Sequence, residues 1–449
     1  MIMPDHSGAR RCVHMTAVAL CLAGCSTHGD RVVLSETLPA PATYAWRATS
    51  FAQQGAASSD GLTFREAIGN AVAFSPSVKA AYAEIDAKQG EALQASFRLN
   101  PELAVALPEV ANNGGLAEED SGQELQISQT LELGGKRFKR LAAADLETSL
   151  AVWDYEVARV LAASQAAEAF VDVLAAQDRL AILNEFVTVA EKTRSVVEAR
   201  VKGGRASPIE LDRAKVSVAQ ARALVEAERA RLEAARRKLA SLWGADYPTF
   251  DRARGRLGRN RSVPTVDEVK AFLEGNPTLA RWADGIAHRY AVLQVEQSKA
   301  IPNMTVGLGV RRFDEDNSSG LLASLSVPLP IFDRNEGNIA AAERRIAKAE
   351  FDAQATRTQL IGLLIEALGA LRAADIQARA IEANVLPAAQ SAFDKTRTGY
   401  EEGKFDLLNV LDTQRTLFEA RRDLINARAE FEKARVQVEV LIGRDLNER

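Results

Sequence analysis

The sequence predicts a mainly α-helical fold with a small β part, in which one structural plan occurs twice. Residues 137–201 contain neither proline nor glycine, and such a stretch is too long for a helix of an ordinary globular domain. Short runs with alternating apolar and polar residues precede it, which is the pattern of β-strands. The same order of features returns about 200 residues later. We therefore expect a duplicated module with long helices and few strands.

The first 24 residues predict a lipoprotein signal peptide. A basic start is followed by an apolar run at 15–23, which is too short to span a bilayer. The run ends in Leu22-Ala23-Gly24-Cys25, which resembles the bacterial lipobox, in which the cysteine carries the lipid. A plain signal peptide with a chance cysteine is the alternative. Residues 25–60 are rich in proline, alanine, serine and threonine, and predict a lipidated flexible tether.

The two predicted halves span 61–250 and 265–443, with a linker at 251–264 and a tail at 444–449. Matching landmarks keep nearly the same separation along the chain: Ser75-Pro76 and Asn276-Pro277, Pro101 and Pro302, Gly204 and Gly403. Solenoid repeats are only about 20–50 residues long, so this pattern indicates duplication of a whole module.

Each half contains one predicted β-hairpin, at 101–133 and 302–331. In the clearest strand, Leu125, Ile127 and Leu131 share one face, while polar residues occupy the other. Each strand covers about ten residues, which a tilted strand needs to cross a bilayer. The alternative, a hairpin packed on a soluble core, is weaker because a lone hairpin is barely stable.

The hairpin loops contain the acidic segments 118–120 and 314–316, and we expect them outside the cell. Four membrane strands cannot close a barrel, because small barrels need about eight or more. The sequence therefore implies an oligomer.

Long helices are predicted at 137–201 and 335–398, the second interrupted by Pro387. Helices at 208–243 and 407–442 return along them with a heptad of large apolar residues: Leu211, Val218, Val225, Leu232 and Leu239, then Val410, Leu417, Leu424, Phe431 and Val438. Three positions after most of these lies a small residue, and Glu228 is the one charged exception. This pattern is typical of antiparallel coiled coils. Shorter helices are expected before each hairpin, at about 62–98 and 277–300.

Four segments at equivalent places in the halves resemble the TolC family of outer-membrane efflux proteins. They are Leu131-Glu132-Leu133-Gly134-Gly135-Lys136-Arg137, the run 327–338 with Leu329-Pro330-Ile331-Phe332-Asp333-Arg334-Asn335, the turn 201–208, and the turn 399–406 with Gly403-Lys404-Phe405-Asp406. The third and fourth form the helix–helix turns. The second and fourth look most like the heavy-metal branch, which serves cobalt–zinc–cadmium (CzcC-like) pumps.

The resemblance implies a homotrimer with a 12-stranded β-barrel and an α-helical periplasmic tunnel. It also implies two protein partners, a periplasmic membrane-fusion (adaptor) protein and an inner-membrane RND transporter. The chain would lie in the lipid of the cell outer membrane, anchored through Cys25, and extend into the periplasm.

Family positions map onto six further residues. The helix–helix turns meet the adaptor, at Gly204, Ser207, Gly403 and Asp406. Two aspartates three residues apart narrow the TolC pore, and the matching positions here are Asn409 and Asp412. Because one aspartate is replaced, we expect a weaker or differently selective constriction.

The expected function is passive conduction of cobalt, zinc and cadmium cations, with nickel as a further candidate. A duct for drugs or other organic solutes is an alternative with the same fold, and a structural coiled-coil lipoprotein is a third. An enzyme is not expected, because no catalytic motif occurs. No cofactor is expected, and all three cysteines and three of four histidines precede residue 29, which argues against a bound metal. The net charge of −4 does not favour nucleic acid.

Overall fold

The computed structural model describes residues 61–107, 122–258, 263–313, 318–444 and 446. They belong to one compact unit within Ala45–Arg449. The predicted signal peptide, the tether with Cys25 and the acidic hairpin loops lie outside the described residues. Across the described ranges, no helix combines the length and the apolar character needed to cross a membrane.

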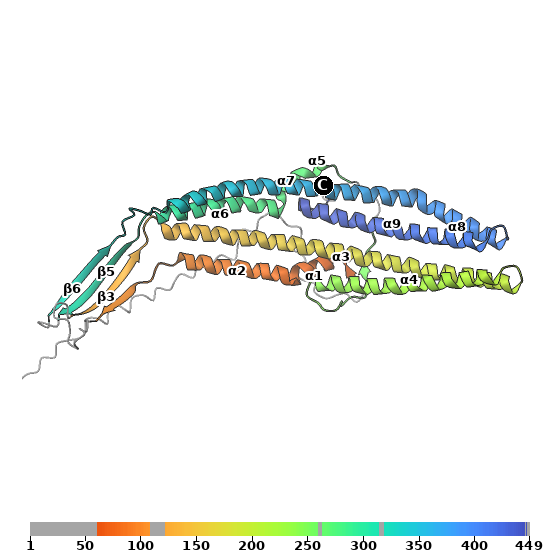
Figure 1. The fold of residues 1–449 in the computed structure, drawn as a ribbon, viewed down its shortest axis with the longest axis horizontal. Helices are drawn as coiled ribbons and strands as arrows, with labels where there is room; N and C mark the ends of the chain where they lie inside the picture. Colours follow the sequence, from red (N-terminus) through yellow and green to blue (C-terminus); the bar gives the residue numbers. More distant parts are fainter. Residues whose placement is uncertain (1–60, 108–121, 259–262, 314–317, 445, 447–449) are drawn as a thin grey trace, which may run out of the picture. The chain divides into compact units, whose positions relative to one another are not determined.

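The first half contains a short helix pair, a hairpin and a long helix pair (Figure 1). Its elements are β1 (Leu62–Thr63), α1 (Phe64–Phe74), α2 (Pro76–Ser96), β2 (Glu102–Ala106), β3 (Gly122–Leu131), α3 (Lys136–Lys202), α4 (Pro208–Ser241) and β4 (Ala253–Arg254). The prediction of a single helix at 62–98 is wrong, because the helix is interrupted at Ser75, between α1 and α2. Pro76 disfavours helical geometry at the preceding Ser75, whose ψ is 129°.

The second half repeats the order of short helices, hairpin and long helix pair, but its long helix is interrupted. Its elements are α5 (Val266–Lys270), the 3₁₀ helix η2 (Ala271–Gly275), α6 (Pro277–Lys299), β5 (Met304–Phe313), β6 (Ser319–Ser326), α7 (Glu336–Ala380), the π-helix η3 (Ile381–Val385), α8 (Leu386–Glu401) and α9 (Leu407–Ile442). The π-helix precedes Pro387, so the predicted interruption of this helix takes the form of one wide turn.

The four long strands form one antiparallel sheet in the order β2-β3-β5-β6. Its centre is the pair β3 and β5, which come from different halves. Their register runs from Gly122 opposite Phe313 to Leu131 opposite Met304. A second, two-stranded sheet joins β1 to β4 in parallel and was not predicted.

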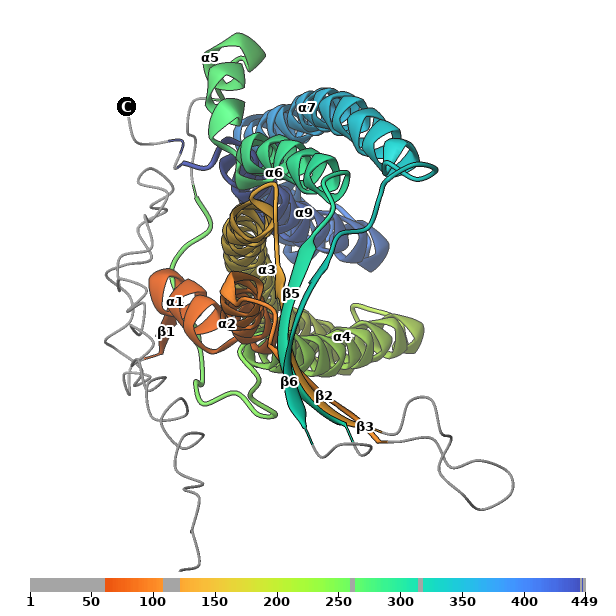
Figure 2. The same ribbon diagram turned by 90° about the vertical axis from the view of Figure 1, so that its left-hand side faces the viewer.

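The helices line up so that each long helix has two shorter partners. α3 packs against α2 and α4 in its own half and against α6 and α9 of the other half (Figure 2). In the second half, α6 and α9 both pack on α7, and α9 continues along α8. The chain therefore forms four helical columns, in which the short helices follow one another beside the long ones.

Both long helices begin at a residue in the left-handed region. Gly135 has φ 71°, and Asn335, which lies 200 positions later, has φ 61°. Asn335 is the single non-glycine residue with positive φ in the described part of the chain. Its side chain does not cap the helix; it donates instead to the Glu296 carbonyl at 2.8 Å and thereby ties α7 to α6. Both long helices thus start from the same left-handed backbone conformation, although the connection after β6 (ending at Ser326) is longer than the one after β3 (ending at Leu131).

Candidate pore and partner-binding site

The four-stranded sheet has one exposed apolar face. Because directly opposed residues of an antiparallel sheet share a face, the register defines two apolar rows across all four strands. These are Val105, Leu125, Val310 and Leu321, and Leu103, Ile127, Leu308 and Ala323. Leu321 is 93% exposed and Leu308 63%. A contiguous apolar surface of this kind marks contact with lipid or with another protein.

The opposite face of the sheet carries hydrogen-bonded polar side chains. Gln126 Nε2 donates to Ser324 Oγ at 2.5 Å, so that its side chain crosses over β5 from β3 to β6. The crossing passes above Gly307, where any side chain would collide with both residues. Nearby, the hydroxyls of Thr130 and Thr305 lie 3.0 Å apart. The sheet therefore combines an apolar side with a hydrogen-bonded polar side, as the strands of outer-membrane proteins do.

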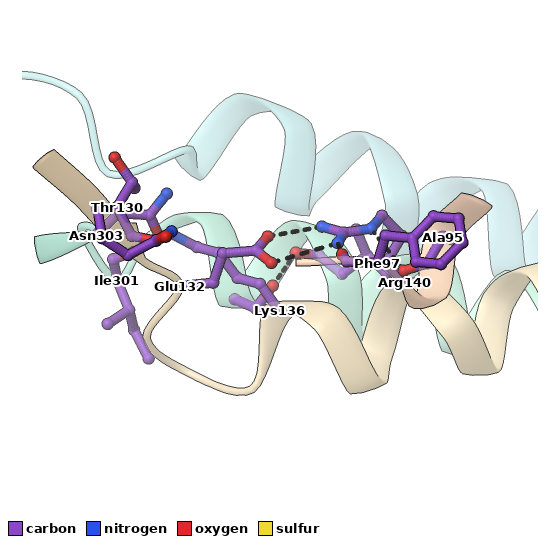
Figure 3. Close-up of polar contacts among 11 residues, drawn as sticks. Ala95, Phe97, Thr130, Glu132, Lys136, Arg140, Ile301 and Asn303 are labelled. Carbon is purple, nitrogen blue, oxygen red and sulfur yellow. Dashed lines mark hydrogen bonds and ion pairs between the residues drawn. The ribbon is translucent and has the colours of Figure 1, made fainter. Parts of the chain in front are cut away.

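Polar contacts fix the place where strand β3 turns into helix α3 (Figure 3). Lys136 Nζ donates to the Ile301 carbonyl and to Asn303 Oδ1, both at 2.5 Å, and so connects the two halves. One turn later, Arg140 forms a two-pronged ion pair with Glu132 at 2.6 and 3.2 Å. Arg140 also donates to the carbonyl of Ala95, at the end of α2. Charge-assisted hydrogen bonds therefore connect the start of α3 to the end of α2 and to the second half of the chain.

The two helix–helix turns, here called the tip (203–207 and 402–406), hold all four predicted adaptor-contacting residues. Gly204 and Gly403 have φ values of 70° and 79°, which favour glycine. Ser207 caps α4 in a capping box with Glu210, and Asp406 Oδ1 caps α9 by accepting from the Asn409 amide at 3.2 Å. All four residues are exposed, so a partner protein has access to them.

Three side chains outside the prediction tie the two turns together. Arg200, at the end of α3, donates to the Tyr400 carbonyl at 2.5 Å and lies over the Tyr400 ring at 4.6 Å. The Tyr400 hydroxyl donates to Glu210 Oε2 on α4 at 3.0 Å. Burial, followed by the hydrogen bond to Glu210, raises the pKa of Tyr400 to about 12. The phenol is therefore a neutral hydrogen-bond donor at physiological pH. Through Arg200, Tyr400 and Glu210, the helix–helix turn of one half is connected to that of the other.

The predicted pore residues lie one turn apart on α9 and have different surroundings. Asn409 Nδ2 donates to Asp406 Oδ1 at 2.6 Å, so its side chain belongs to the helix cap. Asp412 is exposed and accepts from Arg415 at 3.1 Å. The contact between Asp412 and Arg415 could have been predicted from the sequence, because residues three positions apart on a helix are neighbours.

Asp412 also lines a long groove formed by α3, α4 and α9. Phe186 of α3 and Phe418 of α9 meet inside it with ring centroids 4.5 Å apart. Arg179 and the buried Glu228 lie further along, joined by an ion pair of 2.7 Å. This pair accounts for the heptad exception at Glu228. Within the described ranges, no cluster of histidine, cysteine or carboxylate side chains is arranged to hold a metal ion.

Comparison with known proteins identifies the family. Residues 67–245 and 269–444, which correspond to the two halves, match the family described as outer membrane efflux protein. The chain is 32% identical over 383 residues to the cobalt-zinc-cadmium resistance protein CzcC of Cupriavidus metallidurans, covering 85% of this chain and 90% of that protein. It is 29% identical over 292 residues to the nickel and cobalt resistance protein CnrC of the same organism, covering 64% and 68%.

A solved structure of CusC has the same fold, with a TM-score of 0.71 at 16% identity. The match covers 88% of this chain and 96% of that one. The segments 67–245 and 269–444 that match the family contain the four-stranded sheet and the paired long helices of both halves. The chain belongs to the outer membrane efflux protein family.

Proposed function

We propose that this chain is the outer-membrane channel subunit of a tripartite, RND-type efflux pump and that it passively conducts heavy-metal cations. Cobalt, zinc and cadmium are the expected cargo, with nickel as a further candidate. The observation that carries the channel assignment is the sheet with one exposed apolar face and one polar face. An isolated subunit would leave that apolar face in water, whereas a bilayer would cover it.

The proposed assembly is a homotrimer. In the sheet, strands β2 and β6 each pair with one neighbouring strand, so their outer edges are open within the described part of the chain. Open edges favour pairing with another chain. If β2 of one subunit pairs with β6 of the next, three copies close a barrel of twelve strands, above the minimum of about eight. The polar face, with Gln126 and Ser324, then lines the interior.

The metal cargo is supported by the similarity to CzcC and CnrC, whose names describe resistance to cobalt, zinc, cadmium and nickel. The exposed tip, with Gly204, Ser207, Gly403 and Asp406, is the proposed contact with a periplasmic adaptor protein. The lipid anchor at Cys25 stays a prediction, and palmitate labelling of Cys25→Ala tests it. Labelling that survives this substitution would rule out the anchor.

The test of cargo is a deletion strain challenged with zinc, cobalt, cadmium, nickel and copper, and in parallel with dyes and detergents. We expect sensitivity to divalent metals, restored by the wild-type gene. Complementation with Gly403→Val should restore less resistance than complementation with Gly90→Ala. Gly403→Val distorts the second helix–helix turn at a positive φ, whereas Gly90→Ala changes a helical position with free space around it. Sensitivity to dyes and detergents alone would instead favour the duct for organic solutes.

A further inference from the structure

We propose that Arg415 sets the charge selectivity of the constriction by neutralising Asp412, so that the pore is lined by mixed charges and not by an acidic ring. This inference rests on the proposed function and on the predicted pore constriction at Asn409 and Asp412 of α9. It concerns a residue that the family comparison does not point to, and it follows from the contacts of Asp412 in this chain.

The contact is direct and belongs to a ladder of alternating charges along α9. Arg415 Nη2 lies 3.1 Å from Asp412 Oδ1, and Arg415 Nε lies 3.8 Å from Glu419 Oε1. The positions 412, 415 and 419 are spaced by three and four residues, so they follow one face of the helix. Asp412 therefore presents a paired carboxylate to the groove.

The wider groove has the same character. Its lining contains four carboxylates but five arginines: Arg179, Arg213, Arg231, Arg415 and Arg422. A lining of this composition has no excess of negative charge with which to concentrate cations. In a trimer, three Asp412–Arg415 pairs would surround the axis, each nearly neutral when seen from a distance.

Both members of the pair are well exposed, with 66% and 68% of their side chains accessible. Their fields are therefore screened by salt, over about 10 Å at 0.1 M and about 3 Å at 1 M. In dilute salt, a passing ion therefore interacts electrostatically with each of the two charges. Removing only the arginine would uncover three carboxylates, and the pore would then prefer cations more strongly.

The test uses the full-length protein reconstituted in planar bilayers, with the ratio of potassium to chloride permeability obtained from reversal potentials in KCl gradients. Arg415→Gln should raise this ratio severalfold in dilute salt, and the gain should shrink near 1 M. Asp412→Asn should lower the ratio below that of the wild type. Arg415→Lys, which keeps the charge, should leave it nearly unchanged.

A matched control is available on α4. Arg229 pairs with Glu226 at 2.7 Å with the same three-residue spacing, is also exposed, and lies outside the groove lining. Arg229→Gln therefore changes the net charge equally and should leave the permeability ratio unaltered. An unchanged ratio in Arg415→Gln, or an equal shift in Arg229→Gln, would overturn the inference. A wild-type protein that forms no conducting channel would instead contradict the proposed function, and this inference with it.

Discussion

The two helical hairpins place different residues in the same layer of one heptad pattern. In the first half this layer contains Glu228, which is 2% exposed and accepts from Arg179 and Arg231 at 2.7 and 3.1 Å. In the second half the equivalent position is Ala427, which packs with Ile381 and Leu424 in an apolar cluster. One hairpin thus buries a paired carboxylate where the other buries an alanine.

The difference between Glu228 and Ala427 is explained by the neighbouring elements that each residue packs near. Arg179 also donates to Asn426 of α9 at 3.1 Å, so the buried charge of the first half lies where it contacts the second. The apolar layer faces the π-helix η3, whose wide turn precedes Pro387. The shared heptad specifies how each hairpin pairs, and its departures mark where the halves are joined or bent. A buried ion pair adds little stability relative to apolar packing, but removing one partner is costly because the other is left unpaired.

The largest expected effect comes from moving the proline of the second half into the first. Val187 lies 200 positions before Pro387, in the uninterrupted helix α3. Val187→Pro should lower the free energy of unfolding by about 3 kcal/mol or more, because it removes a hydrogen bond and clashes with the preceding turn. Thermal unfolding in detergent, followed by circular dichroism, measures the loss. Pro387→Ala is the control and should change stability by less than about 1 kcal/mol.

Glu228→Leu should have the next largest effect. It leaves Arg179 without its carboxylate acceptor, at a cost of about 1–3 kcal/mol in the free energy of unfolding. Glu226→Gln, which breaks the exposed pair with Arg229, should cost at most about 1 kcal/mol. Chemical denaturation of both variants tests the difference between a buried and an exposed pair. Equal losses would contradict the role given to burial.

Tyr400→Phe should loosen the connection between the two turns. It removes the hydrogen bond to Glu210, which is worth about 1.5 kcal/mol for a charged acceptor. Because the folded-state pKa of Tyr400 is raised to about 12, above an unfolded value near 10, this stabilisation is complete below about pH 10 and is lost as pH rises toward 12. Phenolate absorbance should show a late-titrating tyrosine that the variant lacks.

The smallest effects are expected at the helix caps of the tip. Ser207→Ala removes the capping box of α4, and Asp406→Ala removes the cap of α9. Each should lower the free energy of unfolding by about 0.5–1 kcal/mol. If the turns are equivalent in both halves, the two losses should be similar. A loss confined to one variant would show that the turns differ in strength.

Much of the fold could be predicted from the sequence because its signals are local and periodic. Lys136 and Lys202, the ends of α3, lie one residue outside the predicted 137–201, and α9 has the predicted bounds 407–442. Alternation also indicated the strands β3 and β5. The break at Ser75 was missed although Pro76 signals it.

The candidate site was harder to predict because its contacts join distant parts of the chain. Glu228 stood out as a heptad exception, but its partner Arg179 lies 49 positions away. The bond between Tyr400 and Glu210 spans 190 positions. A single sequence contains no signal for such pairings. The roles of Gly204, Ser207, Gly403, Asp406, Asn409 and Asp412 in binding an adaptor or lining a pore remain predictions.

The central claim, that the apolar face of the sheet contacts lipid while the polar face lines a channel, is tested most directly by two neighbouring residues of β3. Ile127 belongs to the apolar face and Ser128 to the polar one. The natural cysteines all precede residue 26, so Ile127→Cys and Ser128→Cys each add one labelling site within the two halves. With a fluorophore at each site in liposomes, we predict that lipid-borne quenchers act on position 127 and aqueous iodide on position 128. Quenching of both positions by iodide alone would contradict a sheet embedded in the membrane.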